Sequence, residues 1–282
     1  MAYTTLISAA ELAAMISHRD LVILDARFSL DDEQWGKYSY LAGHILGAHQ
    51  ADLAEHMSGE IIEGVTGRRP FPDAEQFAAQ LGTWGISPST QVVTYDNEGG
   101  LMAASRLWLM LRWLGHDAVA VLDGGYQAWL TAGGSVSTQV PTPTTSVYPP
   151  KLRPEFIADV GEVDSARVQE MTCVFDSRGE EGYHGRGKYY DPIRGHIAGA
   201  GLADRAATME SDGRFLSSDA LRAHFISLIG DQAPADVIFY CGSGITAAQN
   251  VLAMTHAGLP GSRMYVGSWS EWITDPSRPV EL

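Results

Sequence analysis

Cysteine is scarce in this chain of 282 residues, which contains only Cys173 and Cys241. A secreted disulfide scaffold is a much shorter chain with more cysteines, and two isolated thiols cannot build a tetrathiolate zinc site. No group of histidines has metal-ligand spacing either. We therefore expect a reduced protein that uses no metal and no cofactor, and a single Cys173–Cys241 disulfide is the minor alternative.

Long apolar runs and basic clusters are also missing. No stretch reaches the roughly 20 apolar residues that span a bilayer, and the N-terminal segment has no basic region ahead of an apolar one. The formal net charge is −15, with no cluster of Lys and Arg to offset it, which argues against nucleic acid as a partner. These absences favour a cytoplasmic protein without a membrane partner. Any site for an anion must be built locally, from backbone N–H groups and a few basic side chains.

What the chain does contain is an internal repeat. The first half holds LVILDAR, LAGHILGAHQADL, QVVTYDNEGG and VLDGGYQAWL, and the second half holds CVFDSR, IRGHIAGAGLADR, VIFYCGSGIT and YVGSWSEWI in the same order. The repeat pairs Asp25 with Asp176, Arg27 with Arg178, His44 with His196, Asp96 with Cys241, and Trp129 with Trp272. A segment rich in Pro and Thr separates the halves. The sequence predicts two tandem domains, 1–134 and 156–282, joined by a linker at 135–155.

Each half alternates short apolar, β-rich runs with helical segments. We expect strands at Leu21–Leu24, Gln91–Tyr95, Ala118–Leu122, Cys173–Phe175, Val237–Tyr240 and Met264–Val266. We expect helices at Asp73–Trp84, Leu101–Leu114, Ser217–Ile229 and Gly244–Ala257, and capping boxes at Ser8/Glu11 and Asp159/Glu162. Near-continuous apolar strands followed by helices indicate a parallel sheet covered on both faces. The predicted fold class is α/β, with two tandem domains of this kind.

Cys241 follows the apolar strand VIFY and opens the loop Gly242-Ser243-Gly244-Ile245-Thr246 ahead of a helix. Ligands of open α/β sheets lie at the carboxyl ends of the strands. Two glycines allow the backbone to curl so that successive N–H groups face the sulfur, and the helix adds its positive dipole end. Both effects favour a thiolate, so we predict a reactive cysteine rather than an inert buried thiol.

These motifs in this order resemble the tandem-domain rhodaneses and 3-mercaptopyruvate sulfurtransferases. The resemblance covers the D-x-R, G-H-I-x-G-A, cysteine-loop and G-S-W-x-E-W motifs, from about Leu21 to Glu281. It implies two rhodanese-like domains, the first of which has lost its cysteine and has Asp96 there. It also implies sulfur transfer through a Cys241 persulfide, from a small anionic donor to cyanide, a small thiol or a thioredoxin-like acceptor.

The resemblance further suggests the donor and its site. CGSGIT is similar to the mercaptopyruvate-type loop C-G-S-G-V-T, which implies 3-mercaptopyruvate as donor, with Ser243 and His44 in the proton relay. The family's first carboxylate-binding arginine aligns with Gly182, which has no side chain for an anion, and the second falls near Tyr189–Asp191. Arg186 and Lys188 lie nearby and are the expected substitutes. The predicted donor site comprises Gly242, Gly244, Ile245, Thr246, Arg186 and Lys188.

The remaining motif residues have structural interpretations. We expect Cys173 to be a small core residue, His196 to hold a turn, and the three tryptophans Trp129, Trp269 and Trp272 to pack in cores or between domains. The Asp25/Arg27 and Asp176/Arg178 pairs are expected to orient loops by ion pairing.

The sequence allows two alternatives to a mercaptopyruvate-type enzyme and excludes a third. A thiosulfate:cyanide sulfurtransferase would use the same nucleophile, and a non-catalytic rhodanese-like binding module would take up no sulfur. A cysteine phosphatase needs C-x5-R, and Ala247 occupies the arginine position, which excludes that class.

Overall fold

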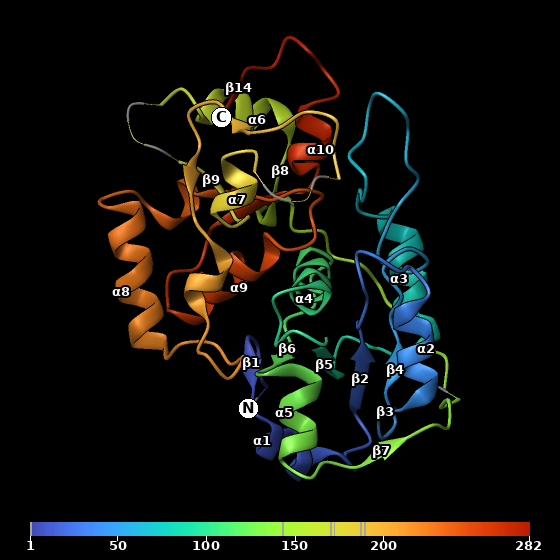
Figure 1. Ribbon diagram of the computed structural model, residues 1–282. Coiled ribbons are helices and arrows are strands. Elements are labelled where there is room, and N and C mark those ends of the chain that lie inside the picture. Colours follow the sequence, from blue (N-terminus) through green and yellow to red (C-terminus); the bar gives the residue numbers. More distant parts are fainter. Residues whose placement is uncertain (1, 143, 170, 172, 187, 189) are drawn as a thin grey trace. The chain divides into compact units, whose positions relative to one another are not determined.

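The computed structural model describes residues 2–142, 144–169, 171, 173–186, 188 and 190–282. The chain forms two compact units (Figure 1). The first comprises Met1–Gly59, Phe71–Arg153 and Glu210–Phe215; the second comprises Glu60–Pro70, Pro154–Met209 and Leu216–Leu282. Each unit therefore includes a short segment from the other half of the sequence. The predicted boundaries 1–134, 135–155 and 156–282 concern the repeated unit of sequence, and they stay a prediction.

The first unit is built on a five-stranded parallel sheet. Its strands lie in the order β1 (Leu6–Ile7), β6 (Val119–Leu122), β5 (Gln91–Tyr95), β2 (Leu21–Asp25) and β4 (His49–Gln50). A separate antiparallel pair joins β3 (His44–Ile45) to β7 (Val136–Ser137). The helices are α1 (Ala9–Met15), α2 (Trp35–Ala42), α3 (Ala74–Thr83), α4 (Ala103–Trp113) and α5 (Gly125–Thr131).

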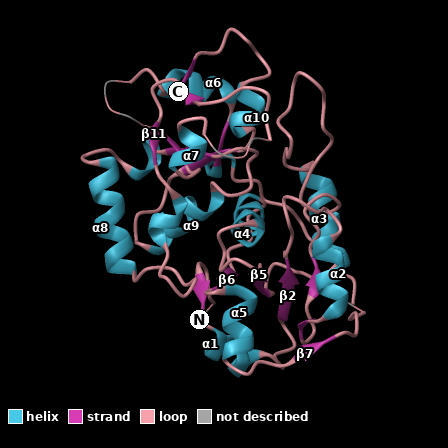
Figure 2. Ribbon diagram, viewed as in Figure 1, coloured by secondary structure: helices cyan, strands magenta, loops and turns pink. Residues whose placement is uncertain are grey.

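The second unit repeats this plan. Its parallel sheet has the order β8 (Ile157–Ala158), β13 (Arg263–Tyr265), β12 (Ile238–Tyr240), β9 (Val174–Asp176) and β11 (Gly201–Leu202). An antiparallel pair joins β10 (His196–Ile197) to β14 (Val280–Glu281). The helices are α6 (Val160–Ala166), α7 (Glu180–Tyr183), α8 (Ser218–Ile229), α9 (Ala248–His256) and α10 (Ser268–Trp272), with short 3-10 turns at Pro154–Phe156, Arg205–Thr208 and Pro234–Asp236. Helices flank both sheets (Figure 2), which confirms the predicted α/β class twice over.

The apolar strands lie inside each unit because helices cover the sheet. Every residue of β5 and β12 is buried, which explains why these strands are continuous apolar runs instead of alternating ones. Trp129 is part of the first core, and Trp269 and Trp272 are part of the second, so the packing role expected for these residues is confirmed. The capping boxes at Ser8/Glu11 and Asp159/Glu162 are also present.

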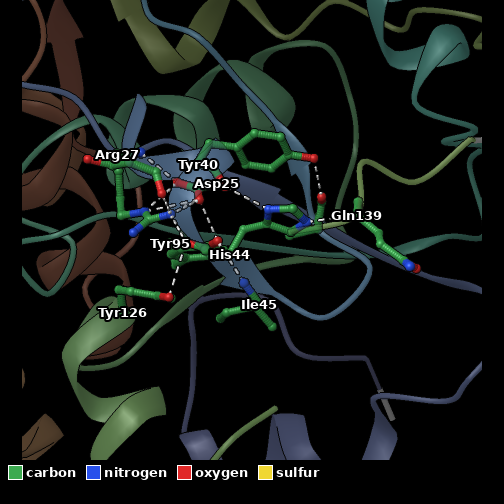
Figure 3. A network of polar contacts seen from close by, with 11 residues as sticks. Asp25, Arg27, Tyr40, His44, Ile45, Tyr95, Tyr126 and Gln139 are labelled. Atoms are coloured by element: carbon green, nitrogen blue, oxygen red, sulfur yellow. Dashed lines mark hydrogen bonds and ion pairs between the residues drawn. The ribbon is translucent and has the colours of Figure 1, made fainter. Parts of the chain in front are cut away.

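The D-x-R motifs hold the loops beside the sheets, as expected. The Arg27 guanidinium donates to the Asp25 carboxylate and, through Nη2, to the carbonyl oxygen of Gly43 at 2.7 Å. In the second unit Arg178 donates to Asp176 and to the carbonyl oxygen of Gly195, also at 2.7 Å. Figure 3 shows the first of these networks. Each arginine thus ties a strand end to the glycine that begins the G-H-I motif.

Two expectations need correction. The helix after Cys241 begins at Ala248 and not at Gly244, because the residues between curl around the sulfur and Gly244 has a φ of +76°. Cys173 is not a core residue: it precedes β9, is half-buried, and its Sγ donates to the Met171 carbonyl oxygen at 3.2 Å. Since β9 and β12 are parallel, Cys173 at the start of one and Cys241 after the end of the other lie at opposite edges of the sheet. Both thiols are free, which excludes the disulfide.

Candidate active site

Cys241 lies at the carboxyl end of β12 with its side chain 1% exposed. Of the residues from 241 to 247, only Gly242 and Thr246 are not fully buried, so the loop opens at these two positions. Asp176 of β9 pairs with Tyr240, and the backbone N–H of Ser177 donates to the Tyr240 carbonyl oxygen, which extends the sheet to the base of the loop. The cysteine is therefore held at the strand edge where ligands of open α/β sheets are found.

The loop stabilises a thiolate. Burial of Cys241 opposes ionisation, but hydrogen bonds from the Thr246 side chain and from the backbone N–H groups of Ser243, Ala247 and Thr246 outweigh it, and the pKa of the thiol lies below its ordinary value. Convergent N–H groups at the start of a helix are the arrangement expected to activate a cysteine. Sequence analysis predicted this cradle, and the structure brings Cys241, Ser243 and Thr246 together within it.

The first unit has the same cradle around a carboxylate. Asp96, the repeat partner of Cys241, is fully buried after β5. Its two carboxylate oxygens accept four backbone N–H groups, those of Glu98, Gly100, Met102 and Ala104, at 2.9 to 3.2 Å. Burial raises the pKa of Asp96, and these four hydrogen bonds act in the opposite direction. The loop of this fold is thus shaped to surround one buried acceptor group with N–H donors.

Ser268 also contacts the cysteine, and sequence analysis did not single it out. It begins α10, and its backbone has a φ of +54°, a value that residues other than glycine rarely adopt. Its hydroxyl accepts the Cys241 N–H at 3.1 Å, donates to the Tyr265 carbonyl oxygen at 2.9 Å and lies 3.9 Å from the sulfur. The G-S-W motif predicts a packing role for its tryptophan; its serine is the only local sign in the sequence of the contact with Cys241.

Arg68 is a charged residue beside the loop that the sequence motifs did not point to; the Arg178 side chain lies beside Gly242 as well. Arg68 belongs to the segment 60–70 of the second unit. Its guanidinium Nη2 lies beside Gly242, 3.6 Å from the point that a Cβ atom there would occupy. Nothing in the local pattern around Cys241 points to a residue so far away in the sequence; the pair of arginines in GRRP was the only signal.

The residues predicted to bind the donor carboxylate are exposed side chains of the same unit. Arg186 has a side chain that is 64% exposed, and its Nη2 lies 3.9 Å from the Glu180 carboxylate. Lys188 is exposed, with its Nζ 5.2 Å from the centre of the Tyr190 ring. A side chain at Gly182 would meet the Arg178 side chain at 2.9 Å. The binding roles of Arg186 and Lys188 therefore stay predictions.

His44 is buried in the first unit with backbone partners at both ring nitrogens. Nδ1 lies 2.8 Å from the Tyr40 carbonyl oxygen and Nε2 lies 3.1 Å from that of Gln139, and the ring stacks on Tyr40 (Figure 3). Its repeat partner His196 likewise stacks on Tyr183, and its Nδ1 lies 3.0 Å from the Tyr183 carbonyl oxygen, which fits the expected structural role. A proton relay through His44 would require one of its contacts to break, and that role stays a prediction.

Two further observations bear on the kind of site. In the part of the chain that the structure describes, no group of three or more His, Cys, Asp or Glu side chains is arranged to hold a metal ion. Within the same residues no helix is both long and apolar enough to cross a membrane.

Comparison with known proteins identifies the family of this chain. Residues 8–132 and 160–275 each match the family model described as a rhodanese-like domain. The chain is 40% identical to the "Probable 3-mercaptopyruvate sulfurtransferase" of Pseudomonas aeruginosa over 281 residues, 99% of either protein. It is 30% identical to the thiosulfate sulfurtransferase of Bos taurus over 257 residues, 90% of this chain and 85% of that protein.

The fold is similar to that of a solved relative as well. The crystal structure of SseA from Escherichia coli, a 3-mercaptopyruvate sulfotransferase by its description, matches with a TM-score of 0.79 at 28% identity, over 95% of this chain and 100% of that one. Each family segment includes four of the five strands of one parallel sheet, and the relatives match along almost the entire chain. The chain therefore belongs to the tandem-domain rhodanese and 3-mercaptopyruvate sulfurtransferase family and is a sulfurtransferase.

Proposed function

We propose that this sulfurtransferase takes sulfur from 3-mercaptopyruvate, releases pyruvate, and carries the sulfur as a persulfide on Cys241. The observation that carries the proposal is the cradle of donors around the Cys241 sulfur, which lowers the pKa of the thiol and offers the same N–H groups to a persulfide anion. The name of the Pseudomonas aeruginosa relative supports this choice of donor.

The chemistry proceeds in two displacements. The Cys241 thiolate attacks the donor sulfur, so that a new S–S bond forms while the donor C–S bond breaks and its electron pair leaves as the enolate of pyruvate. The donor's thiol proton is released from the persulfide, and the enolate takes up one proton at carbon, which balances the step. We assign this proton transfer to the hydroxyl of Ser243, which is buried in the loop, and backbone N–H groups hold the persulfide anion.

The second displacement regenerates the thiolate. An acceptor such as cyanide, a small thiol or a thioredoxin-like dithiol attacks the outer sulfur, and Cys241 leaves. Because the donor product departs before the acceptor reacts, we expect parallel double-reciprocal lines. The free thiols support a reducing compartment such as the cytoplasm as the site of action.

The test compares two donors with cyanide as the acceptor. Initial rates of thiocyanate formation are measured from 3-mercaptopyruvate and from thiosulfate, for the wild type and for Cys241→Ser. We expect a strong preference for 3-mercaptopyruvate that the serine variant abolishes, and mass spectrometry should find one added sulfur on the wild type only. A preference for thiosulfate would overturn the donor assignment and leave the nucleophile in place. Transfer that survives in Cys241→Ser would overturn the proposal itself.

A further inference from the structure

We infer that Arg68 binds the carboxylate of the sulfur donor beside Cys241. It thereby replaces the carboxylate-binding arginine that the family has at the position of Gly182. The inference rests on the proposed function, since it assigns the donor subsite of the same loop. It makes the segment 60–70, which comes from the other half of the sequence, a part of the donor site.

The backbone around Arg68 is fixed to the residue that also fixes the cysteine loop. The N–H of Arg68 donates to the Ser270 hydroxyl at 3.0 Å, and the N–H of Ser270 donates to the Gly242 carbonyl oxygen at 2.9 Å. Ser270 is buried and lies in α10. One residue of α10 thus anchors the backbone of both Arg68 and the loop, which sets the position of the Arg68 backbone relative to Gly242.

The side chain of Arg68 is held in place but still reached by solvent. Its Nη1 donates to the Asp191 carboxylate, and its Nη2 lies beside Gly242. The Arg68 side chain is 36% exposed, whereas that of Asp191 is only 13% exposed. A half-exposed guanidinium with one nitrogen held by a carboxylate is oriented in advance, and its other nitrogen lies beside one of the two places where the cysteine loop opens.

Electrostatics link Arg68 to the cysteine directly. Burial lowers the pKa of the Arg68 guanidinium, and attraction to the Cys241 thiolate acts in the opposite direction. The guanidinium therefore lies within effective electrostatic range of the reacting sulfur. A donor whose carboxylate met Arg68 would bring its own sulfur, only a few bonds away, towards Cys241.

Three other cations of this unit are less suited to the role. The Arg178 side chain also lies beside Gly242 and interacts with Cys241, but its guanidinium is directed to Asp176 and to the Gly195 carbonyl oxygen. Arg186 lies near Glu180 and is largely exposed. Lys188 lies over the Tyr190 ring, which the Arg68 guanidinium also contacts, but its ammonium is a point charge. A planar guanidinium matches a carboxylate better than an ammonium does. Of these four cations, Arg68 is the one whose placement and shape fit the donor carboxylate best.

The experiment compares a charged donor with a neutral one of the same shape. Sulfur transfer to cyanide is measured with 3-mercaptopyruvate and with 1-mercaptopropan-2-one, which has a methyl group in place of the carboxylate. For Arg68→Met we expect kcat/KM to fall about 10- to 100-fold with 3-mercaptopyruvate, mainly through KM. With the neutral donor we expect a change of less than about threefold, because no carboxylate remains to be bound.

Three further variants make the result specific. Arg68→Lys should recover part of the loss, since the charge remains but the planar fork does not. Arg19→Met removes the same charge from a side chain that is 91% exposed, and we expect no change with either donor. Arg186→Met tests the rival position, and a loss confined to 3-mercaptopyruvate in that variant, with Arg68→Met unaffected, would overturn the inference.

The remaining outcomes are also decisive. Equal losses with both donors in Arg68→Met, or in Arg68→Lys if the methionine variant does not fold, would mean that Arg68 is structural and would overturn the inference. Failure of the proposed function is distinguishable, because the wild type would then form no Cys241-dependent thiocyanate from 3-mercaptopyruvate in the first place. If Arg68→Met loses activity with 3-mercaptopyruvate but turns over thiosulfate like the wild type, Arg68 belongs to a carboxylate subsite and not to a general anion site.

Discussion

The reactivity of Cys241 depends on donors that reach its sulfur from three residues of the loop that follows it. Backbone N–H groups of Ser243, Thr246 and Ala247 contribute, and Thr246 adds its hydroxyl. Backbone donors cannot be removed by ordinary substitution, so the Thr246 hydroxyl is the part of the cradle that mutation can test. Thr246 is only half-buried, which makes a change of its side chain tolerable for packing.

We predict that Thr246→Val slows the reaction of Cys241 at neutral pH by about tenfold, the effect of losing one hydrogen bond to a charged group. The sign follows from the thiolate: the hydroxyl stabilises the ionised form and lowers the pKa of the thiol, so its loss moves that pKa upward. The measurement is the rate of alkylation by iodoacetamide as a function of pH, whose midpoint should shift to higher pH. Ser243→Ala keeps its backbone donor and should leave the midpoint unchanged; equal midpoints in the wild type and Thr246→Val would contradict the prediction.

At the level of secondary-structure elements, the turn into α10 has a strained backbone at Ser268, and this backbone positions the Ser268 hydroxyl. Ser268 adopts a φ of +54° where glycine would be at ease. Its hydroxyl accepts the Cys241 N–H and donates to the Tyr265 carbonyl oxygen, so it ties β13 and α10 to the cysteine. Strain of this kind persists where the surrounding structure enforces it, and it is often found near active sites.

Ser268→Ala and Ser268→Gly should separate the strain from the hydroxyl. Both lose the two hydrogen bonds, so we predict that both lower kcat/KM for sulfur transfer several-fold. At this positive φ alanine remains strained, whereas glycine adopts the angle without steric cost. Ser268→Gly should therefore be more stable than Ser268→Ala by about 1 kcal/mol. Urea unfolding gives the two free energies. If alanine proves as stable as glycine, the backbone at this position is not strained; if both variants turn over like the wild type, the hydroxyl does not position Cys241.

The elements themselves were largely predictable, whereas the contacts around the site were not. The strands Leu21–Leu24 and Gln91–Tyr95 were correct because buried parallel strands leave a direct trace as apolar runs. The start of α9 was wrong by four residues, since the donors that surround Cys241 occupy what looks like the first helical turn. Arg68 could not be found from local pattern, because its proximity to Gly242 depends on a segment far away in the sequence.

For the whole molecule, duplication has produced two scaffolds with one reactive residue. Both sheets have the same strand order, and both place an acceptor at the same strand end. In the first unit that acceptor is the Asp96 carboxylate with its four N–H donors, a closed and internally satisfied arrangement. In the second unit the corresponding loop surrounds the Cys241 thiol with donors from Ser243, Thr246 and Ala247, and we propose that this thiol takes up and releases sulfur. The second unit also includes residues 60–70, so the repeated halves of the sequence are not the compact units of the structure.

We predict that donor binding requires residues 60–70 to be packed in the second unit, and that Gly67→Ala weakens donor binding by loosening them. A Cβ at Gly67 would clash with the Gly267 carbonyl oxygen and lie 2.6 Å from the Ser270 hydroxyl, the atom that accepts the Arg68 N–H. Overpacking of this size costs about 1–3 kcal/mol, enough to loosen the segment from α10. We expect kcat/KM for 3-mercaptopyruvate to fall about tenfold while the alkylation midpoint of Cys241 stays in place.

Proteolysis provides the second measurement for the same variant. Trypsin cleaves after Arg68 only when the segment opens, so cleavage there should be faster in Gly67→Ala than in the wild type. The matched control is Gly161→Ala, where the added Cβ would meet only the Asp159 carboxylate at 3.4 Å, an ordinary contact. Because that control changes the same residue type within the same unit, it should cleave and turn over like the wild type. Wild-type cleavage and turnover in Gly67→Ala would show that residues 60–70 do not depend on α10 for their position, and Arg68 would then need another explanation for its place beside Cys241.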